Sequence, residues 1–185
     1  MRNKINIPNN IVLVYCKKKY ILTLIGPLRR KSTKLKLEIL VLKSQNKIVV
    51  SQNPTFRVSN AERKQLKALQ GSTIILIKQL ISETYQLFYK KLKFIGIGYR
   101  ALQLSNFDSK LLLLKLGYSH NIYFRIPINS NCFLKKTNIF LFGNSYKHTT
   151  QLASLLRSLK KPEPYKGKGI LYENELIVLK EGKKV

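Results

Sequence analysis

Two different spacings of apolar residues alternate along the chain, and their order limits the folds that it can adopt. β-prone runs, some with apolar residues two positions apart as on a half-buried strand, come first. From Ser59 onward, apolar residues recur every three or four positions, which is the period of a helix with one apolar face. The order then repeats, because strand-like runs fill 87–142 and a second helical stretch follows from about residue 145. We therefore predict an α+β fold of two similar subdomains, residues 1–82 and 83–185, each an antiparallel β-sheet with a helix packed on one face.

Local patterns predict how the first strands are connected. Three lysines at 17–19 separate the β-prone runs 11–16 and 20–25, which favours a hairpin with a basic tip. Residues 28–33 follow a Gly-Pro pair and carry three consecutive basic residues, so we expect them to form a loop. The runs 34–42 and 47–51 are expected to pair with each other, which completes an antiparallel meander.

Residue types near the helix ends predict where both helices lie. Ser59 and Glu62 have the spacing of a capping box, in which each side chain accepts a hydrogen bond from the other residue's backbone N–H. Gly71 interrupts the apolar stripe of this helix, which we interpret as a point of close packing. The second helix is expected to begin near Ser145 and to end at Lys160, shortly before Pro162.

The charge of the chain indicates the class of its partner. The 185 residues include 35 Lys and Arg against 8 Asp and Glu, a formal net charge of +27. The strongest common polyanion that could balance this charge is a nucleic-acid backbone, and a membrane surface is the weaker alternative. Apolar runs such as Ile74 to Ile77 are far shorter than the roughly 18 residues of a membrane-spanning helix, so we predict no membrane span.

The sequence offers little material for catalysis. It contains only two histidines, His120 and His148, and two distant cysteines that we expect to be reduced and buried. Residues 96–101 match the letters of a dinucleotide fingerprint, but the residues that follow alternate like a strand, where that fingerprint requires a helix. We therefore predict no enzyme activity, no metal site, no cofactor and no small-molecule substrate.

The segment Lys160 to Ile170 carries the most specific pattern in the chain. Two prolines stiffen it, two glycines allow close approach of the backbone to a ligand, and lysines alternate with Tyr165. These residue types fit phosphate contacts with an aromatic stack on a base or sugar of RNA or DNA. The alternative is a solvated basic loop. No helix has the composition of a basic recognition helix, because the second contains only Lys147 and Arg157, so a DNA-binding or nucleoid protein is the second candidate.

The same segment resembles a known family. Residues 161–170, with Tyr172, Glu173, Glu175 and the run 180–184 after them, are similar to the C-terminal signature of ribosomal protein six of the bacterial-type large subunit. Further similar stretches occur in the order of that family, and together they cover essentially the whole chain: Ile7-Pro8, Gly26-Pro27, Leu69 to Thr73, Gly96 to Ala101 and Leu116 to His120.

The resemblance implies a fold, a place and a set of contacts. It implies two similar α+β subdomains and a structural role in the large ribosomal subunit, near the stalk base and the elongation-factor site, in support of translation. Its partners would be large-subunit rRNA and neighbouring large-subunit ribosomal proteins. The residues expected to bind RNA are Lys160, Lys161, Tyr165, Lys166, Gly167, Lys168, Gly169, Lys183, Lys184, Tyr118 and His120.

Departures from the family pattern, together with the composition, indicate the cellular compartment of the protein. The basic N-terminus ahead of Ile7 is short, Leu28-Arg29 replaces the usual Lys-Gly, and no import leader is apparent. The chain has 27 Lys, 19 Ile and 14 Asn but only 4 Ala, a preference for A/T-rich codons. We therefore expect an organelle-encoded protein of the mitochondrion, with a plastid or an A/T-rich bacterium as alternatives.

Overall fold

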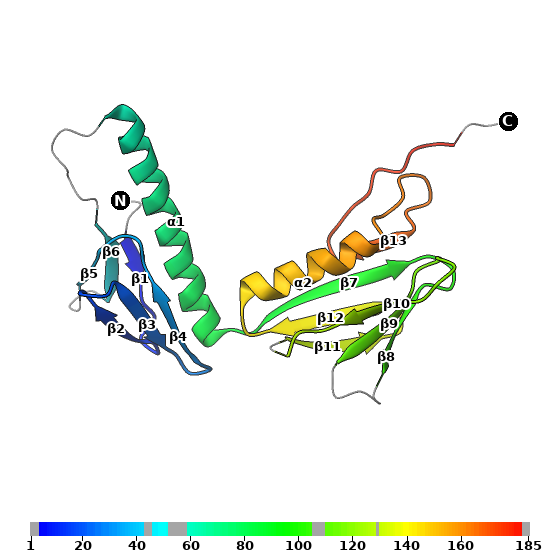
Figure 1. The fold of residues 1–185 in the computed structure, drawn as a ribbon, viewed down its shortest axis with the longest axis horizontal. Coiled ribbons are helices and arrows are strands. Elements are labelled where there is room, and N and C mark those ends of the chain that lie inside the picture. Colours follow the sequence, from blue (N-terminus) through cyan, green and yellow to red (C-terminus); the bar gives the residue numbers. More distant parts are fainter. Residues whose placement is uncertain (1–3, 43–45, 52–58, 105–109, 129, 183–185) are drawn as a thin grey trace. The chain divides into compact units, whose positions relative to one another are not determined.

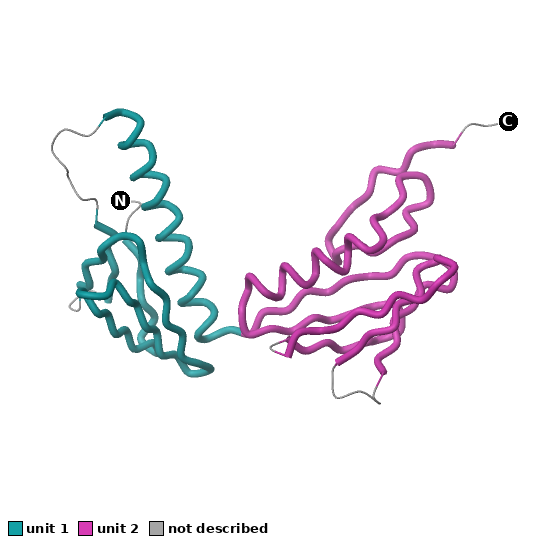
Figure 2. Tube along the Cα trace, viewed as in Figure 1, with its two compact units in different colours: residues 1–86 teal, residues 87–185 magenta. Residues whose placement is uncertain are grey.

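The computed structural model describes residues 4–42, 46–51, 59–104, 110–128 and 130–182. The chain divides into two compact units, residues 1–86 and 87–185 (Figure 2). Each unit has a hydrophobic core made only of its own residues. The boundary that the sequence predicts, after residue 82, falls in the last turn of the first helix, which runs to Tyr85. That residues 1–82 and 83–185 are the two subdomains stays a prediction.

The described residues of unit 1 form six strands and one long helix (Figure 1). The strands form two three-stranded antiparallel sheets, in the orders β1-β6-β5 and β2-β3-β4. Helix α1 (Asn60–Tyr85) contributes Ile77, Leu80 and Ile81 to the core beside these sheets. The strands are β1 (Lys4–Asn6), β2 (Val12–Cys16), β3 (Ile21–Ile25), β4 (Arg30–Lys34), β5 (Ile39–Leu42) and β6 (Lys47–Val50).

The strand predictions for unit 1 are confirmed for the pairs β2-β3 and β5-β6 but not for residues 28–38. Of the run 34–42, only Lys34, in β4, and Ile39–Leu42, in β5, are strand. Strands β2 and β3 form the hairpin with the lysine tip, and β5 pairs with β6. The prediction of a loop over 28–33 is wrong, because β4 begins at Arg30 and pairs with β3. Its side chains alternate between exposed and half-buried, so most of the charge points to solvent. The half-buried Lys31 pairs with the buried carboxylate of Glu83 on α1, which allows a lysine at that position.

Helix α1 begins as the capping box predicts. Ser59 is the N-cap, the Glu62 amide donates to the Ser59 hydroxyl at 3.3 Å, and the Ser59 amide donates to the Glu62 carboxylate at 3.0 Å. Farther along, Gln70 donates a side-chain hydrogen bond to the carbonyl oxygen of Val50 at 3.1 Å, which ties the helix to β6. The expectation of close packing at Gly71 is wrong, because a Cβ there would meet nothing within 4 Å.

In unit 2, the part of the chain that the structure describes forms seven strands and one helix. One sheet has four antiparallel strands in the order β11-β12-β7-β13, and a second has three in the order β10-β9-β8. Both sheets and helix α2 (Tyr146–Leu159) contribute to one core. The strands are β7 (Phe88–Ile95), β8 (Arg100–Leu104), β9 (Leu111–Lys115), β10 (Ile122–Arg125), β11 (Ser130–Lys135), β12 (Asn138–Gly143) and β13 (Gly169–Tyr172).

The fold class is confirmed: the chain is α+β, with antiparallel sheets and a helix packed in each unit. Each unit distributes its strands over two sheets, where the sequence pattern indicated one. Strands β1, β11 and β13 were not expected from the sequence. β13 follows a loop rich in lysine and glycine, and only its pairing with the far end of β7 reveals it as a strand. The turn at Ile97 and Gly98 leads into strand β8 and not into a helix, as the alternation predicts.

Candidate nucleic-acid interface

The loop between α2 and β13, residues 160–169, is held in place by backbone hydrogen bonds. Within it, the Glu163 amide donates to the Lys168 carbonyl oxygen at 2.9 Å, and the Gly167 amide donates to the Glu163 carbonyl oxygen at 3.0 Å. Its two ends are joined, because the Ile170 amide donates to the Lys160 carbonyl oxygen at 2.9 Å. These bonds fix the backbone of the loop, so its side chains start from defined positions.

The two glycines of this loop are both buried, and both shape the backbone. Gly169 has φ +153°, and a Cβ there would lie 2.6 Å from the Cα of Pro162. Gly167 has φ +68°, in the left-handed region that favours glycine. Their RNA contact stays a prediction, and the structure gives them a further role in closing the loop.

The side chains of the loop differ in exposure. Lys161, Tyr165 and Lys166 are exposed, and Lys160 and Lys168 are half-buried. In the described part of the chain, none of these four lysines forms an ion pair. Their charges are therefore available to an external anion such as a phosphate.

Tyr118 and His120 lie at the start of the loop, where Tyr118 contacts both His120 and Lys160. The Tyr118 hydroxyl donates to the Leu159 carbonyl oxygen at 3.0 Å, and the Lys160 Nζ lies 4.2 Å from the centroid of the Tyr118 ring. The Tyr118 and His120 rings stack with centroids 5.8 Å apart and an angle of 18° between their planes. The turn after β9 and the basic loop thus form one continuous surface, which we call the loop surface (residues 118–120 and 160–168).

Two carboxylates after β13 are neutralised by cations of unit 2. Arg157 on α2 donates to both carboxylate oxygens of Glu175, one of them at 2.9 Å, and the Tyr172 amide donates to the same carboxylate at 3.1 Å. These hydrogen bonds hold the pKa of Glu175 below its usual value and raise the pKa of Arg157. Lys91 on β7 binds Glu173 at 2.6 Å and lowers the pKa of that carboxyl. Sequence reasoning did not identify Arg157 and Lys91 as positioning residues, because their partners are 18 and 82 residues away.

The remaining predicted site residues lie elsewhere. Lys183 and Lys184 fall outside the described residues. His148 is exposed in the first turn of α2. Both cysteines are free, but the expectation that both are buried is wrong, because Cys16 on an edge strand is exposed and only Cys132 is half-buried.

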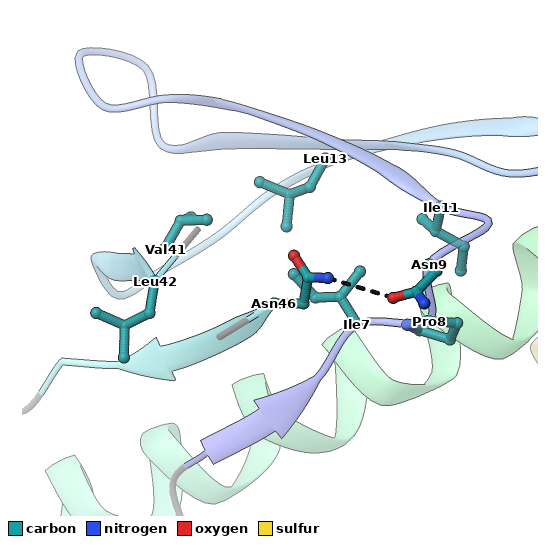
Figure 3. A pocket seen from close by; sticks show the side chains of 8 residues that line it. All are labelled: Ile7, Pro8, Asn9, Ile11, Leu13, Val41, Leu42 and Asn46. Carbon is teal, nitrogen blue, oxygen red and sulfur yellow. Dashed lines mark hydrogen bonds between the residues drawn. The ribbon is translucent and has the colours of Figure 1, made fainter. Parts of the chain in front are cut away.

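A small hollow in unit 1, about 170 Å³ in volume, is lined by aliphatic and asparagine side chains (Figure 3). Asn46 donates to the Asn9 side-chain oxygen at 3.2 Å across it, and its lining includes no charged group. Over the described ranges, no three metal-ligating side chains of His, Cys, Asp or Glu lie together. In the same part of the chain, no helix is long and apolar enough to cross a membrane.

The fold and the loop surface define a basic α+β protein. It presents lysines and aromatic rings from a fixed backbone, which is typical of a binding protein. The family model for ribosomal protein L6 matches residues 95–173, a stretch that includes both parts of the loop surface.

Relatives named large ribosomal subunit protein uL6 match most of the chain. The protein of Karelsulcia muelleri is 36% identical over 182 residues, covering 96% of this chain and 93% of the relative. That of Mycoplasma genitalium is 39% identical, covering 88% and 84%, and that of Chloroherpeton thalassium is 36% identical, covering 85% and 83%. The chain belongs to the ribosomal protein L6 (uL6) family, whose members are structural ribosomal proteins and not enzymes.

Proposed function

We propose that this protein, as a structural component of a large ribosomal subunit, binds large-subunit rRNA through the loop surface. Membership of the family supports the ribosomal role. The observation that carries the RNA contact is the hydrogen-bonded loop, whose lysines have no acidic partner in the described structure while Glu173 and Glu175 are paired with other cations. Lys161, Lys166 and Lys168 would neutralise phosphates, because an ammonium group beside a phosphate releases condensed counterions.

The aromatic rings of the loop surface add a second kind of contact. Tyr165 is exposed and can stack on a base or pack against a sugar. Tyr118 and His120 already stack on each other and can extend a column of rings to an unpaired base. Recognition of this kind depends on the shape of the RNA and on its backbone, and the specificity would come from the fixed loop.

We further propose that the protein lies near the stalk base and the elongation-factor site, beside other large-subunit proteins. This rests on the resemblance of residues 161–175 to the family signature. The A/T-leaning composition, with 27 Lys and 19 Ile, supports an organelle ribosome, and we favour the mitochondrion. A plastid and the cytoplasm of a bacterium are the alternatives, and the named relatives are bacterial.

A basic DNA-binding or nucleoid protein is the alternative function. It would need a basic helix to enter the major groove. Helix α2 carries only Lys147 and Arg157, and Arg157 is bound to Glu175. Helix α1 carries more basic residues, Arg63, Lys64, Lys67 and Lys78. RNA is the better match because the loop surface presents its cations and rings from a loop, as proteins that bind unpaired bases do.

The salt dependence of RNA binding tests the proposal. Lys166→Ala with Lys168→Ala should weaken binding to a large-subunit rRNA fragment and reduce the slope of log K against log salt by up to about 0.9 for each lost phosphate contact. The matched control is Lys64→Ala with Lys67→Ala, two exposed lysines on α1 that remove the same charge from unit 1. Equal slopes for the loop variant and the unchanged protein would contradict the assignment, and so would tighter binding to duplex DNA than to the rRNA fragment.

A further inference from the structure

The four-stranded sheet of unit 2 has one face in the core. Its other face is open over β11, β12 and the first half of β7, whereas Leu171 on β13 is buried there. Leu92, Ile139 and Leu141 point to the core, where they pack in one cluster with residues of α2. Figure 1 shows α2 lying along this sheet. Because successive side chains of a strand point to opposite faces, the residues that alternate with these three lie on the face turned away from α2.

Four aromatic side chains gather on this open face, which we call the aromatic face: Tyr89, Phe133, Phe140 and Phe142. In the strand register, Tyr89 lies opposite Phe142, and Phe140 lies opposite Phe133. The rings of Phe133 and Phe140 are 6.2 Å apart between centroids and tilted by 48°. Tyr89 is 62% exposed and Phe133 56% exposed, although burial of such large rings is favourable. Exposed rings clustered in this way are typical of a binding surface.

Lysines lie beside the rings, one in the row of Phe140 and two in the row after it. Lys91 lies opposite Phe140, with its Nζ 5.4 Å from the centroid of that ring. Lys93 and Lys135 both lie opposite Asn138 in the next row. None of the four strands contains Asp or Glu, and Glu173, just past β13, pairs with Lys91 at 2.6 Å. The aromatic face is therefore apolar and positively charged at once.

We infer that the aromatic face is a second RNA-binding site, which takes the unpaired bases of single-stranded RNA. Bases stack on exposed aromatic rings without regard to sequence, and lysines beside the rings neutralise the phosphates. This site goes beyond the proposed contact of the loop surface, and none of the residues that form it belongs to that surface. It stands on the register of the strands, the exposure of the rings and the sign of the charge.

The charge pattern favours RNA over a protein partner. Lys93 donates a hydrogen bond to the carbonyl oxygen of Glu173 at 3.4 Å. Neither Lys93 nor Lys135 forms an ion pair within the described residues, so an apolar protein segment laid on the rings would cover both charges without supplying a carboxylate, which is costly. A strand of RNA supplies a ring system and a negative charge with every nucleotide, which matches a surface where aromatic and lysine side chains adjoin. A protein that docks through apolar contacts is the competing outcome of the test.

The test measures binding of the full chain to a fluorescently labelled oligouridylate of about ten nucleotides, a length within the usual range of single-strand sites. Tyr89→Ala and Phe133→Ala should each weaken binding at least about fivefold, the lower end of what one base stack contributes. Phe133→Leu keeps an apolar side chain but removes the aromatic ring, so it should weaken binding nearly as much. The matched control is Tyr123→Ala on β10, which removes a ring that is 59% exposed outside the aromatic face and should leave binding unchanged.

The variants also separate this site from the loop surface. Thermal melts that match the unchanged protein show that the variants fold. Folded Tyr89→Ala and Phe133→Ala proteins that bind the oligouridylate normally would overturn the inference, while the proposed rRNA contact could still stand on the Lys166 and Lys168 variants. Normal binding by Phe133→Leu would also overturn the inference. An apolar contact without an aromatic ring would then be enough for binding, and a protein could make such a contact.

Discussion

The Tyr118 hydroxyl donates a hydrogen bond to the carbonyl oxygen of Leu159, the last residue of α2, at 3.0 Å. The last carbonyl groups of a helix have no partner within the helix, so this bond satisfies one of them from the turn after β9. The same ring lies 4.2 Å from the Lys160 ammonium. One side chain therefore joins two segments of the chain that are 41 residues apart and fixes the start of the basic loop.

Tyr118→Phe should lower the free energy of unfolding by about 1 kcal/mol, because it removes one hydrogen bond and keeps the ring. RNA binding should weaken less than in Tyr118→Ala, which also removes the stack with His120 and the contact with Lys160. Urea denaturation gives the first quantity, and a titration with an rRNA fragment gives the second. Tyr123→Phe, at an exposed position, is the control and should change neither. Equal RNA binding by the Phe and Ala variants would contradict a role for the ring.

Gly169→Ala should destabilise unit 2 by roughly 1–3 kcal/mol, because φ there is +153° and the new Cβ would lie 2.6 Å from the Cα of Pro162. It should also weaken RNA binding, since the loop cannot close as before. Gly182→Ala is the control, because a Cβ at that position meets nothing within 4 Å. Thermal unfolding followed by circular dichroism checks both. A Gly169→Ala protein as stable as the control would show that the approach of Pro162 does not constrain the loop.

Glu175→Gln should lower stability by about 1 kcal/mol at neutral pH, because it replaces a carboxylate that accepts hydrogen bonds from Arg157 and from the Tyr172 amide. The pKa of Glu175 is lowered in the folded protein from its usual 4.5. The stability from its ionised form is therefore fully present above about pH 4.5 and is lost as the pH falls through the lower folded pKa.

The difference in unfolding free energy between the unchanged protein and Glu175→Gln should accordingly shrink between pH 6 and pH 3. Glu163→Gln provides the control, since Glu163 is exposed and forms no ion pair within the described residues. Denaturant unfolding across this pH range measures the difference. A gap that stays constant down to pH 3 would mean that the pair with Arg157 contributes nothing to stability.

A chain of residues 87–185 should fold by itself, because its core contains only residues of unit 2. We expect one cooperative unfolding transition from this fragment, at the same denaturant concentration as one of two transitions in the full chain. Denaturation followed by circular dichroism compares the two proteins. A fragment without a cooperative transition would show that the two units depend on each other to fold.

Sequence reasoning located the elements whose boundaries depend on local residues. The capping box at Ser59 and the apolar periods of α1 and α2 are local properties, and both helices lie where these patterns place them. The prediction of a loop at Arg30 was wrong because the contacts that make this segment a strand come from residues distant in the sequence. Pairing with β3 and the buried Glu83 partner of Lys31 decide it.

The residue types of the candidate site could be predicted from the sequence, but the contacts that hold these residues in place could not. The alternation of lysine, proline and glycine marks residues 160–169 as a contact loop. The joining of Tyr118 to Leu159 and of Arg157 to Glu175 depends on distances that no spacing in the sequence encodes. The same holds for the aromatic face, which exists only because β11, β12 and β7 are neighbours in one sheet.

The central claim is that this protein binds large-subunit rRNA as part of the ribosome. Sedimentation of the native protein through a high-salt gradient, followed by detection in each fraction, tests it most directly. We predict that the protein travels with the large ribosomal subunit, and that the Lys166→Ala and Lys168→Ala double variant leaves the subunit at a lower salt concentration than the Lys64→Ala and Lys67→Ala control. Native protein found free of the large subunit, or bound to DNA, would contradict the claim.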